Sequence, residues 1–471
     1  MSRVLTIFFK DVRHLWPQVL VFFATAALAV ITDPALGVKL YSSMLRNGAP
    51  ILEPVACWVL IVALIHEERL IGHEQYWLTR PYTWRHLVAA KALFLAVFVS
   101  LPLLVCQYIT LAAIDRVPLH WIPALLWHQV FFAIFVILPA VAIAAVTANL
   151  AQVIIGVVVS APFVAFGGGW SVGQGSDWGG LGWIRTCAAA LVILSGVAAV
   201  VILQYTRRRT GLARIVVAAT LVLAVAVACA PRWSPAFTVQ RLFARQTVSD
   251  AAASLSVDAS AIGTHPVKFL GWPPDYGALD IPLRVAGLPP GLRVGGDWIS
   301  VTLETPGGVW RSGWLTAETF RGSSEETIWM RFHMDRNFYD RWKEVPVKLS
   351  ATADLTLYQH VRDAPLDGLA QEPDGGLCGT IDRGLLSCTS PFLRYAITLE
   401  QGPPESREQI SLYKSFAPFP TVVGFRPFDG PLRPQYAQTV PSTLLSFDRP
   451  VTHIQRSFEA RGIRLKDLAR E

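Results

Sequence analysis

The chain has 471 residues, of which 52% are hydrophobic and only 16% charged, and its mean hydropathy is +0.41. A soluble globular domain carries about 25% charged residues, so the composition favours a membrane protein and the length allows two or three domains. Residues 1–231 hold 15 Lys and Arg against 8 Asp and Glu, whereas residues 232–471 hold 26 of each. The net charge of +7 therefore belongs to the apolar half, which excludes a soluble basic domain that binds nucleic acid.

Residues 1–16 predict an interfacial amphipathic helix. At 3.6 residues per turn, one face collects apolar side chains. These are Val4, Ile7, Phe8 and Leu15. Asp11 falls on the same side and weakens the pattern. Such a helix lies in the membrane interface, and we expect Pro17 to turn the chain into the bilayer.

Seven apolar segments follow, each near the roughly 20 residues that a helix needs to cross the hydrocarbon core. They are residues 17–32, 50–66, 92–114, 124–148, 152–168, 183–204 and 213–231. Only Asn149–Gln152 separates segments 124–148 and 152–168, so one re-entrant hairpin is the alternative for this pair. Residues 17–231 thus predict an α-helical polytopic membrane bundle of about seven transmembrane helices.

Lys and Arg gather on one side of these segments. With the N-terminus inside, eleven lie on the inner side and four on the outer side, a bias that sets orientation. The inner residues are Arg3, Lys10, Arg13, Arg69, Arg80, Arg85, Lys91, Arg207, Arg208, Arg209 and Arg214, and the outer ones are Lys39, Arg46, Arg116 and Arg185. We therefore expect an integral protein of the bacterial cytoplasmic (inner) membrane, with residues 232–471 outside.

Few polar residues interrupt the apolar segments. Glu53 opens the second segment near its outer end, and His128 and Gln129 lie early in the fourth. A polar group inside the membrane is a functional hypothesis by default, but placement near a segment end favours interfacial anchoring. Nothing in this pattern indicates a proton relay.

Two motifs resemble catalytic signatures but lack their spacing or context. A zinc-protease helix needs His at i and i+4, whereas His73 follows His66 by seven residues. Gly169–Gly173 matches a nucleophile elbow, yet it lies in a Gly-rich loop between apolar segments instead of on a strand-to-helix turn. The sequence also lacks the GxxxxGK[ST] phosphate loop. We therefore expect no catalytic residue, metal site or cofactor in this chain.

The stretch between the second and third segments carries most of the local charge. The resemblance it supports is to the ABC-2 type transporter permeases, in which a Glu and a Gly precede a short leucine-rich segment, a Pro-containing turn, a basic residue and a Lys. The corresponding residues here are Glu68, Gly72, Leu78, Pro81, Arg85 and Lys91. The amphipathic N-terminal helix is a second likeness, and together the two cover roughly residues 1–210.

The resemblance implies a permease unit that works with a separate ATP-binding cassette (ABC) ATPase subunit on the cytoplasmic side. In that family the loop between the second and third crossings, with the N-terminal helix, receives the movement of the ATPase. The implied coupling residues are Glu67, Glu68, Gly72, Leu78, Arg80, Pro81, Arg85 and Lys91. One unit makes half of a pathway, which implies a homo- or heterodimer. A solvated loop with ordinary topogenic charges is the alternative.

Residues 232–471 predict a β-rich, sandwich-like domain, because short period-two runs are bounded by Gly, Pro and Asp clusters. The predicted strands include Trp298–Glu304, Thr327–Met334, Val347–Tyr358 and Arg394–Glu400, arranged as one large sandwich or two small ones. Ser457–Glu471 predicts a short polar helix.

The last two cysteines, Cys378 and Cys388, flank a Gly-containing turn in this half. A disulfide across a hairpin is expected there if the domain faces an oxidising compartment, and two unpaired thiols are the alternative.

Two functional hypotheses follow. In the first, the chain is the membrane-spanning permease subunit of an ATP-driven ABC-2 type transporter, coupled through residues 67–90 to a separate ATPase subunit. In the second, it is a membrane-anchored extracytoplasmic receptor or assembly factor with no ATPase partner. The His and acidic residues of the C-terminal half are scattered, so we expect a binding role there rather than an enzymatic one.

Overall fold

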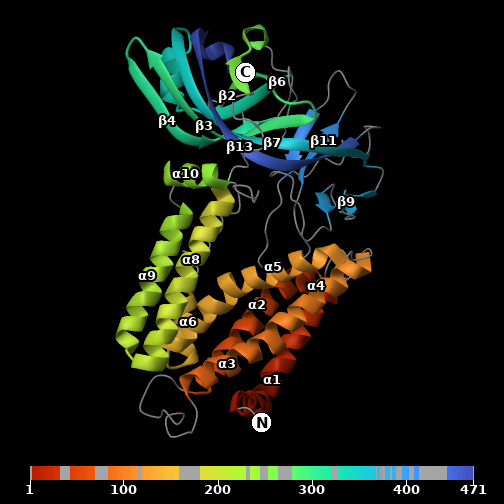
Figure 1. Cartoon of the computed structure of the whole chain (residues 1–471), viewed down its shortest axis with the longest axis vertical. Coiled ribbons are helices and arrows are strands. Elements are labelled where there is room, and N and C mark those ends of the chain that lie inside the picture. Colours follow the sequence, from red (N-terminus) through yellow and green to blue (C-terminus); the bar gives the residue numbers. More distant parts are fainter. Residues whose placement is uncertain are drawn as a thin grey trace. The chain divides into compact units, whose positions relative to one another are not determined.

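A computed structural model gives the fold of the chain, which divides into two compact units (Figure 1). The helical unit consists mainly of residues 1–174 and 185–229, and the strand unit of residues 175–184, 230–415 and 424–471. The residues that the structure describes are 3–31, 43–68, 83–114, 119–158, 181–229, 234–243, 253–263, 278–319, 322, 326–366, 369–371, 373, 377–381, 385–388, 395–401, 408–412 and 443–469.

The helical unit is built from long apolar helices (Figure 1). They are α1 (Arg3–Ile31), α2 (Ser43–His66), α3 (Trp84–Leu95), α4 (Leu101–Ile114), α5 (Ile122–Phe132), α6 (Leu138–Val146), a helix over 150–158, α8 (Leu181–Ile202) and α9 (Thr210–Cys229). A short 3₁₀ turn, Leu119–Trp121, precedes α5. Within the described ranges, five helices are long and apolar enough to cross a membrane, and Leu52–His66 is a shorter apolar helix. These helices indicate an integral membrane protein.

Most of the predicted segments coincide with these helices. Those at 17–32, 92–114, 124–148, 183–204 and 213–231 fall on the five long helices, and 50–66 falls on the shorter one. The structure describes the segment at 152–168 only as far as residue 158. The presence of apolar spans is therefore confirmed, whereas the number seven stays a prediction.

Pro17 does not turn the chain, contrary to expectation. It lies inside α1, which continues from Arg3 to Ile31. A proline removes one backbone hydrogen bond, and membrane helices tolerate this loss when neighbouring groups support the backbone. At 1.5 Å per residue, α1 is about 43 Å long, more than the roughly 30 Å hydrocarbon core. Its length therefore lets the first turns extend beyond the apolar layer.

The same short motif occurs twice where a helix widens to π geometry. Ala96–Ser100 (η3) precedes Leu101 and Pro102 in AVFVSLP, and Ala133–Ile137 (η5) precedes Leu138 and Pro139 in AIFVILP. Each leucine N–H donates to the carbonyl five residues back, on Ala96 and Ala133 respectively. The following proline has no N–H and crowds the carbonyl four residues back, so a wider turn accommodates it.

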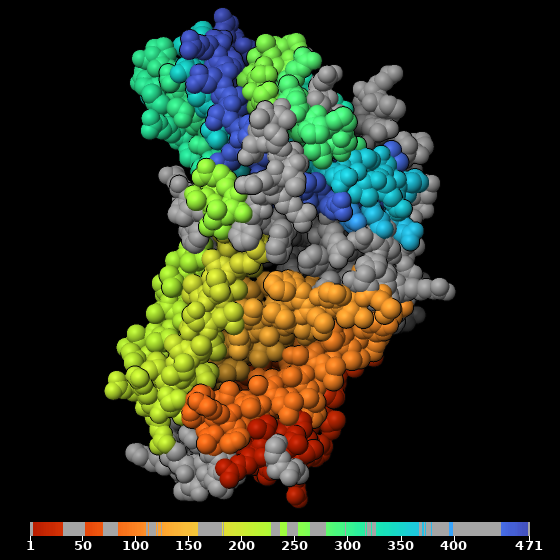
Figure 2. All heavy atoms as spheres, viewed as in Figure 1, coloured from red at the N-terminus to blue at the C-terminus, as the bar shows by residue number. Residues whose placement is uncertain are grey.

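Apolar packing holds α1, α2, α3 and α6 together, and the outer faces stay apolar. Phe22, Leu60 and Phe94 are fully buried in this core. In contrast, Leu191 in α8 and Ile215 in α9 are each 65% exposed, and side chains of α5, α8 and α9 cover much of the unit's face in Figure 2. Large exposed apolar faces of this kind suit contact with lipid.

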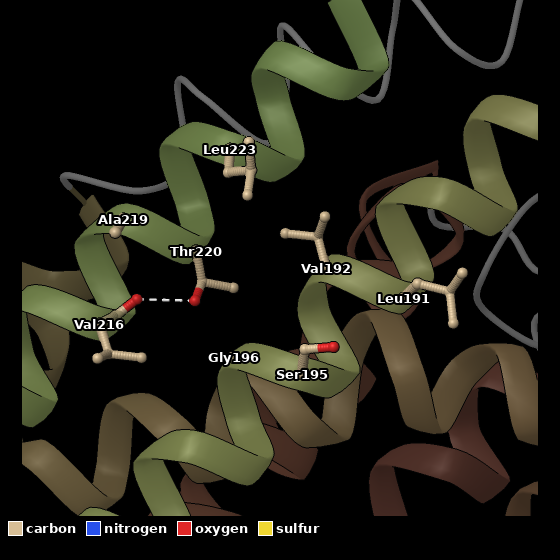
Figure 3. Close-up of a pocket in the computed structure, with 8 residues that line it drawn as sticks. All are labelled: Leu191, Val192, Ser195, Gly196, Val216, Ala219, Thr220 and Leu223. Carbon is tan, nitrogen blue, oxygen red and sulfur yellow. Dashed lines mark hydrogen bonds between the residues drawn. The ribbon is translucent and has the colours of Figure 1, made fainter. Parts of the chain in front are cut away.

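The helices α8 and α9 form a hairpin through a π turn, Leu203–Arg207 (η6), and Arg208 in the left-handed conformation (φ 53°). Gly196 in α8 lies against Thr220 in α9, since a Cβ added to Gly196 would lie 2.1 Å from Thr220 Oγ1. Small residues permit such close approach between membrane helices. A groove beside this contact contains no charged side chain (Figure 3). It is lined by Leu191, Val192, Ser195, Gly196, Val216, Ala219, Thr220 and Leu223.

The strand unit contains three antiparallel sheets among its described residues. Their orders are β1-β2-β6-β5, β10-β9-β8 and β12-β11-β13-β7-β3-β4. The strands are β1 (Ser254–Val257), β2 (Ala278–Ala286), β3 (Leu292–Thr305), β4 (Gly308–Thr316), β5 (Glu318–Thr319), β6 (Thr327–His333), β7 (Pro346–Pro365), β8 (Leu369–Gln371), β9 (Leu377–Ile381), β10 (Leu385–Cys388), β11 (Ala396–Gln401), β12 (Glu408–Leu412) and β13 (Thr443–Arg464). Two helices, α10 (Ser234–Phe243) and α11 (Arg336–Trp342), accompany them.

The prediction of a β-rich domain is confirmed. Its arrangement is intermediate between the two that were expected, one large sandwich and two small ones. The four-stranded and six-stranded sheets enclose one core, to which β2, β3, β6 and β7 contribute alternate apolar residues. A second, smaller core includes Ala370, Cys378, Ile397 and Phe447. The long strands β7 and β13 pair along most of their lengths and carry residues of both cores (Figure 1). Two cores therefore share one sheet.

The helix predicted over Ser457–Glu471 is wrong. β13 continues to Arg464 and is followed by a 3₁₀ turn, Leu465–Asp467. Phe458 and Ile463 are buried in the first core, and this stretch pairs with the start of β7. Tertiary pairing with β7 thus overrides a local pattern of charged residues that favours a helix.

Candidate functional site

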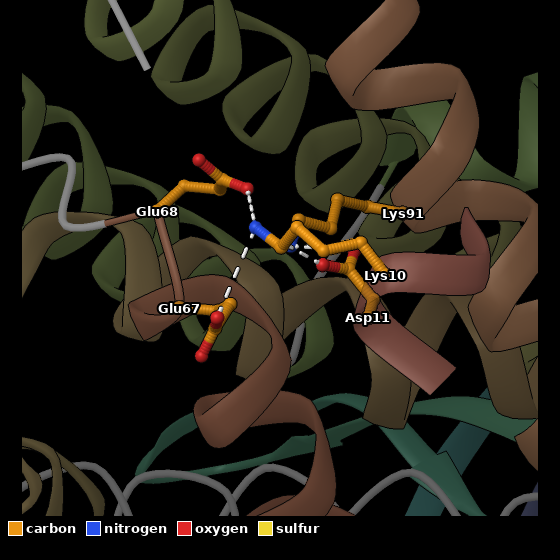
Figure 4. Close-up of polar contacts among 5 residues, drawn as sticks. All are labelled: Lys10, Asp11, Glu67, Glu68 and Lys91. Atoms are coloured by element: carbon orange, nitrogen blue, oxygen red, sulfur yellow. Dashed lines mark hydrogen bonds and ion pairs between the residues drawn. The ribbon is translucent and has the colours of Figure 1, made fainter. Parts of the chain in front are cut away.

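Five charged side chains meet at one end of the helical unit (Figure 4). We call them the ionic cluster: Lys10 and Asp11 of α1, Glu67 and Glu68 directly after α2, and Lys91 of α3. Lys10 Nζ lies 2.5 Å from Glu68 Oε1 and 3.8 Å from Glu67 Oε1. Lys91 Nζ donates to Asp11 Oδ2 at 2.9 Å. The cluster therefore joins three helices by opposite charges.

Because of its burial, the Asp11–Lys91 pair is the part of this cluster that is most costly to break. The Asp11 side chain is fully buried, and that of Lys91 is 5% exposed. Breaking a buried ion pair by removing one partner costs about 3–5 kcal/mol, because an uncompensated charge stays behind. A carboxylate is tolerated on the apolar face of α1 at Asp11 because Lys91 lies opposite it and balances its charge.

A second polar junction covers the C-terminal end of α6. The last carbonyls of a helix have no partner within it. Those of Ala144 and Ala145 accept from His66 Nε2 at 3.1 Å and Gln204 Nε2 at 3.0 Å, respectively. The Val146 carbonyl accepts from Arg214 Nε at 3.1 Å. Because His66 immediately precedes Glu67, this junction adjoins the ionic cluster and connects it to η6 and α9.

The start of α3 is fixed locally. The Thr83 N–H donates to His86 Nδ1 at 3.3 Å, which occupies a backbone donor at the helix N-terminus. Arg85 is exposed, and its guanidinium carbon lies 5.6 Å from the centroid of the Trp84 ring. The basic residue of the predicted motif thus lies on the surface at the beginning of a capped helix.

The structure brings Glu67, Glu68 and Lys91 of the predicted coupling residues into one cluster and places Arg85 nearby in sequence, on the surface. The predicted residues Gly72, Leu78, Arg80 and Pro81 lie outside the described residues. Sequence reasoning did not place Lys10 and Asp11 in the site. The available signal was Asp11 itself, since a carboxylate on an apolar helix face needs a buried partner.

In the strand unit, Cys378 is buried and disulfide-bonded. The register of β9 and β10 sets Cys378 directly opposite Cys388, the arrangement required for a bridge across a hairpin. Across the described residues, no group of three or more His, Cys, Asp or Glu could hold a metal ion.

Comparison with known proteins yields no relative. No family model matches the chain, and no curated protein or solved structure is significantly similar to it. The role of the ionic cluster is therefore inferred from the geometry of this chain alone.

Proposed function

We propose that the chain is the membrane-spanning permease subunit of an ATP-driven ABC-2 type transporter. In this proposal a separate ATPase subunit binds on the cytoplasmic side at residues 67–90, and two permease units form a homo- or heterodimer. The observation that carries the proposal is the ionic cluster, since Glu68 at the start of this loop and Lys91 directly after it each pair with α1.

The cluster gives the loop mechanical connections to the bundle. A force applied to the loop reaches α1 through the Lys10–Glu68 pair, which measures 2.5 Å, and through the Lys91–Asp11 pair. Packed helices move as rigid elements and not as deformable ones. Pulling on the loop would therefore displace α1, α2 and α3 together.

The α6 junction would carry the displacement further. His66 in α2 and Arg214 in α9 both bind the terminal carbonyls of α6. A displacement of α2 would therefore be transmitted to α6 and α9 or resisted by them. Three consecutive Arg residues, at positions 207 to 209, connect η6 to α9. Such basic clusters mark the cytoplasmic side of membrane proteins, which supports the proposed orientation and leaves the strand unit extracytoplasmic.

Purification of the full chain in mild detergent tests the proposal. We expect an ATP-binding cassette subunit to accompany it, identified by mass spectrometry. Lys10→Ala and Glu68→Gln should each lower the ATPase rate of the complex several-fold. Lys348→Ala is the matched control, because Lys348 forms an ion pair of 3.1 Å with Glu304 in the strand unit and should leave the rate unchanged. A chain that purifies without any ATPase would favour the receptor or assembly-factor hypothesis.

A further inference from the structure

One carboxyl group of the helical unit is buried and has no polar partner among the described residues. Glu53 is only 5% exposed, and no hydrogen bond or ion pair joins it to another described residue. As predicted, it lies at the start of the apolar stretch Leu52–His66, and α2 itself begins ten residues earlier, at Ser43. A buried carboxylate is costly unless it is paired, and such residues inside membrane segments mark binding sites and pathways by default.

Polar groups from two other helices lie at the same level as Glu53. Glu53 precedes Glu68 of the ionic cluster by 15 residues, or about 22 Å along a helix. Gln107 follows Lys91 by 16 residues in the continuous helix α3–η3–α4, or about 24 Å. Gln107 Oε1 accepts from Gln129 Nε2 of α5 at 2.9 Å. Measured from one common end, α2, α4 and α5 thus carry polar side chains at similar depth.

Glu53 lies within electrostatic range of a residue of α4. Its carboxyl group lies close enough to the thiols of Cys57 and Cys106 to interact with both. Cys106 immediately precedes Gln107 in α4. The carboxyl group on α2 therefore lies in the neighbourhood of α4, the helix whose Gln107 amide is bonded to Gln129.

The unused groups of this region are acceptors. Gln129 Oε1 is buried and accepts no hydrogen bond from any residue that the structure describes, and the Glu53 carboxylate offers further lone pairs. Glu53, Cys57 and Cys106 are not a metal site, since no metal-binding group of three such residues occurs within the described ranges. A ligand that fits must supply positive charge and several N–H donors, which a primary ammonium group does.

The flanking backbone also differs from ordinary helix. The π turn η3 ends six residues before Cys106, and η5 begins four residues after Gln129. Single π turns inside helices occur frequently at functional sites. Both helices that line this region with α2 therefore carry a wide turn close to their polar residues.

We propose that Glu53 is the anionic end of a binding site for an amphiphilic primary amine. The ammonium group donates hydrogen bonds to Glu53 and Gln129, and the apolar tail lies among the membrane helices. As the site of a transported molecule it rests on the proposed function, whereas binding itself requires no ATPase.

Binding of decylamine to the full chain in nanodiscs tests this site. The ligand-dependent rise of the unfolding temperature gives the affinity. Decyltrimethylammonium, which has the charge but no N–H donor, and 1-decanol, which is neutral, are the comparison ligands. We expect decylamine to bind most tightly, and Glu53→Gln and Gln129→Leu to weaken it, Glu53→Gln by about tenfold or more. Glu304→Gln, on the surface of the strand unit, is the control variant.

A second measurement on the unaltered chain guards against misfolded variants. Dicyclohexylcarbodiimide modifies carboxyl groups in apolar surroundings, and mass spectrometry locates the product. We expect modification of Glu53 that decylamine suppresses several-fold and 1-decanol does not. If decylamine leaves the modification of Glu53 unchanged, the carboxyl group is protonated and does not bind the amine. This result would overturn the proposal. Equal affinity of all three ligands, or unchanged affinity in Glu53→Gln, would overturn it too. None of these outcomes depends on whether an ATPase co-purifies.

Discussion

Asp11 and Lys91 are 80 residues apart in sequence and form a buried ion pair, with 2.9 Å between Lys91 Nζ and Asp11 Oδ2. The pair fixes the N-terminal helix to the helix that follows the loop at residues 67–90. Lys91, the last residue of the predicted coupling motif, thus has an immediate structural role in addition to any contact with a partner.

The Asp11–Lys91 pair should show strong coupling in a double-mutant cycle. Lys91→Met leaves Asp11 buried without its counter-charge and should cost about 3 kcal/mol of unfolding free energy. Asp11→Leu should cost a similar amount by stranding Lys91. The double variant, which buries two apolar side chains, should be more stable than either single one. Unfolding of the full chain in detergent measures all three, and additive effects would show that the pair does not form.

The close contact of α8 and α9 predicts a sharp difference between two glycines. Gly196→Ala places a Cβ within 2.1 Å of Thr220 Oγ1 and 2.8 Å of its Cβ, so the helices must separate, at a cost of about 1–3 kcal/mol. Gly211→Ala is the matched control in α9, because a Cβ there meets nothing within 4 Å. Since alanine favours helix, the control should equal or slightly exceed the parent in thermal stability. Equal stability of the two variants would argue against this helix packing.

Asp258 predicts a pH dependence in the strand unit. Hydrogen bonds from the Ser260 and Thr327 hydroxyls, at 2.5 and 2.6 Å, and the nearby Arg284 lower the pKa of its carboxyl group. A lowered folded pKa stabilises the fold above the unfolded pKa of about 4. The contribution is lost as pH falls from there through the folded pKa. Asp258→Asn should therefore be less stable than the parent at pH 6, and the gap should narrow below pH 4. A gap that widens on acidification would contradict this.

The strand hairpin at Cys378 predicts the redox state of the mature protein. Because Cys378 is disulfide-bonded and faces Cys388 across β9 and β10, peptides containing the two positions should stay linked until a reductant is added. Disulfides persist in oxidising compartments, so protein isolated from cells should show the linkage if the strand unit is extracytoplasmic. If both cysteines react with an alkylating reagent before any reductant is added, the strand unit lies in a reducing compartment.

Periodicity in the sequence was sufficient to predict the apolar helices and the strands such as Thr327–His333, because burial on one face imposes a period on each. It failed where a distant partner decides the outcome. Ser457–Arg464 is strand because β7 pairs with it. The helix α1 continues through Pro17, with Leu15 and Val19 on either side of the proline packed into the core shared with other helices. The ionic cluster was only half predictable: Glu67, Glu68 and Lys91 lie in a recognisable motif, whereas Lys10 and Asp11 join them only through folding.

The central proposal is that a separate ATPase subunit binds the loop at residues 67–90. A photo-crosslinking amino acid at position 78 of the full chain, expressed in its native cell, tests this most directly, with position 194 on the exposed face of α8 as the comparison. We expect position 78 to yield a covalent product containing an ATP-binding cassette subunit and position 194 to yield none. A product with such a subunit from neither position, or equally from both, would contradict the proposal.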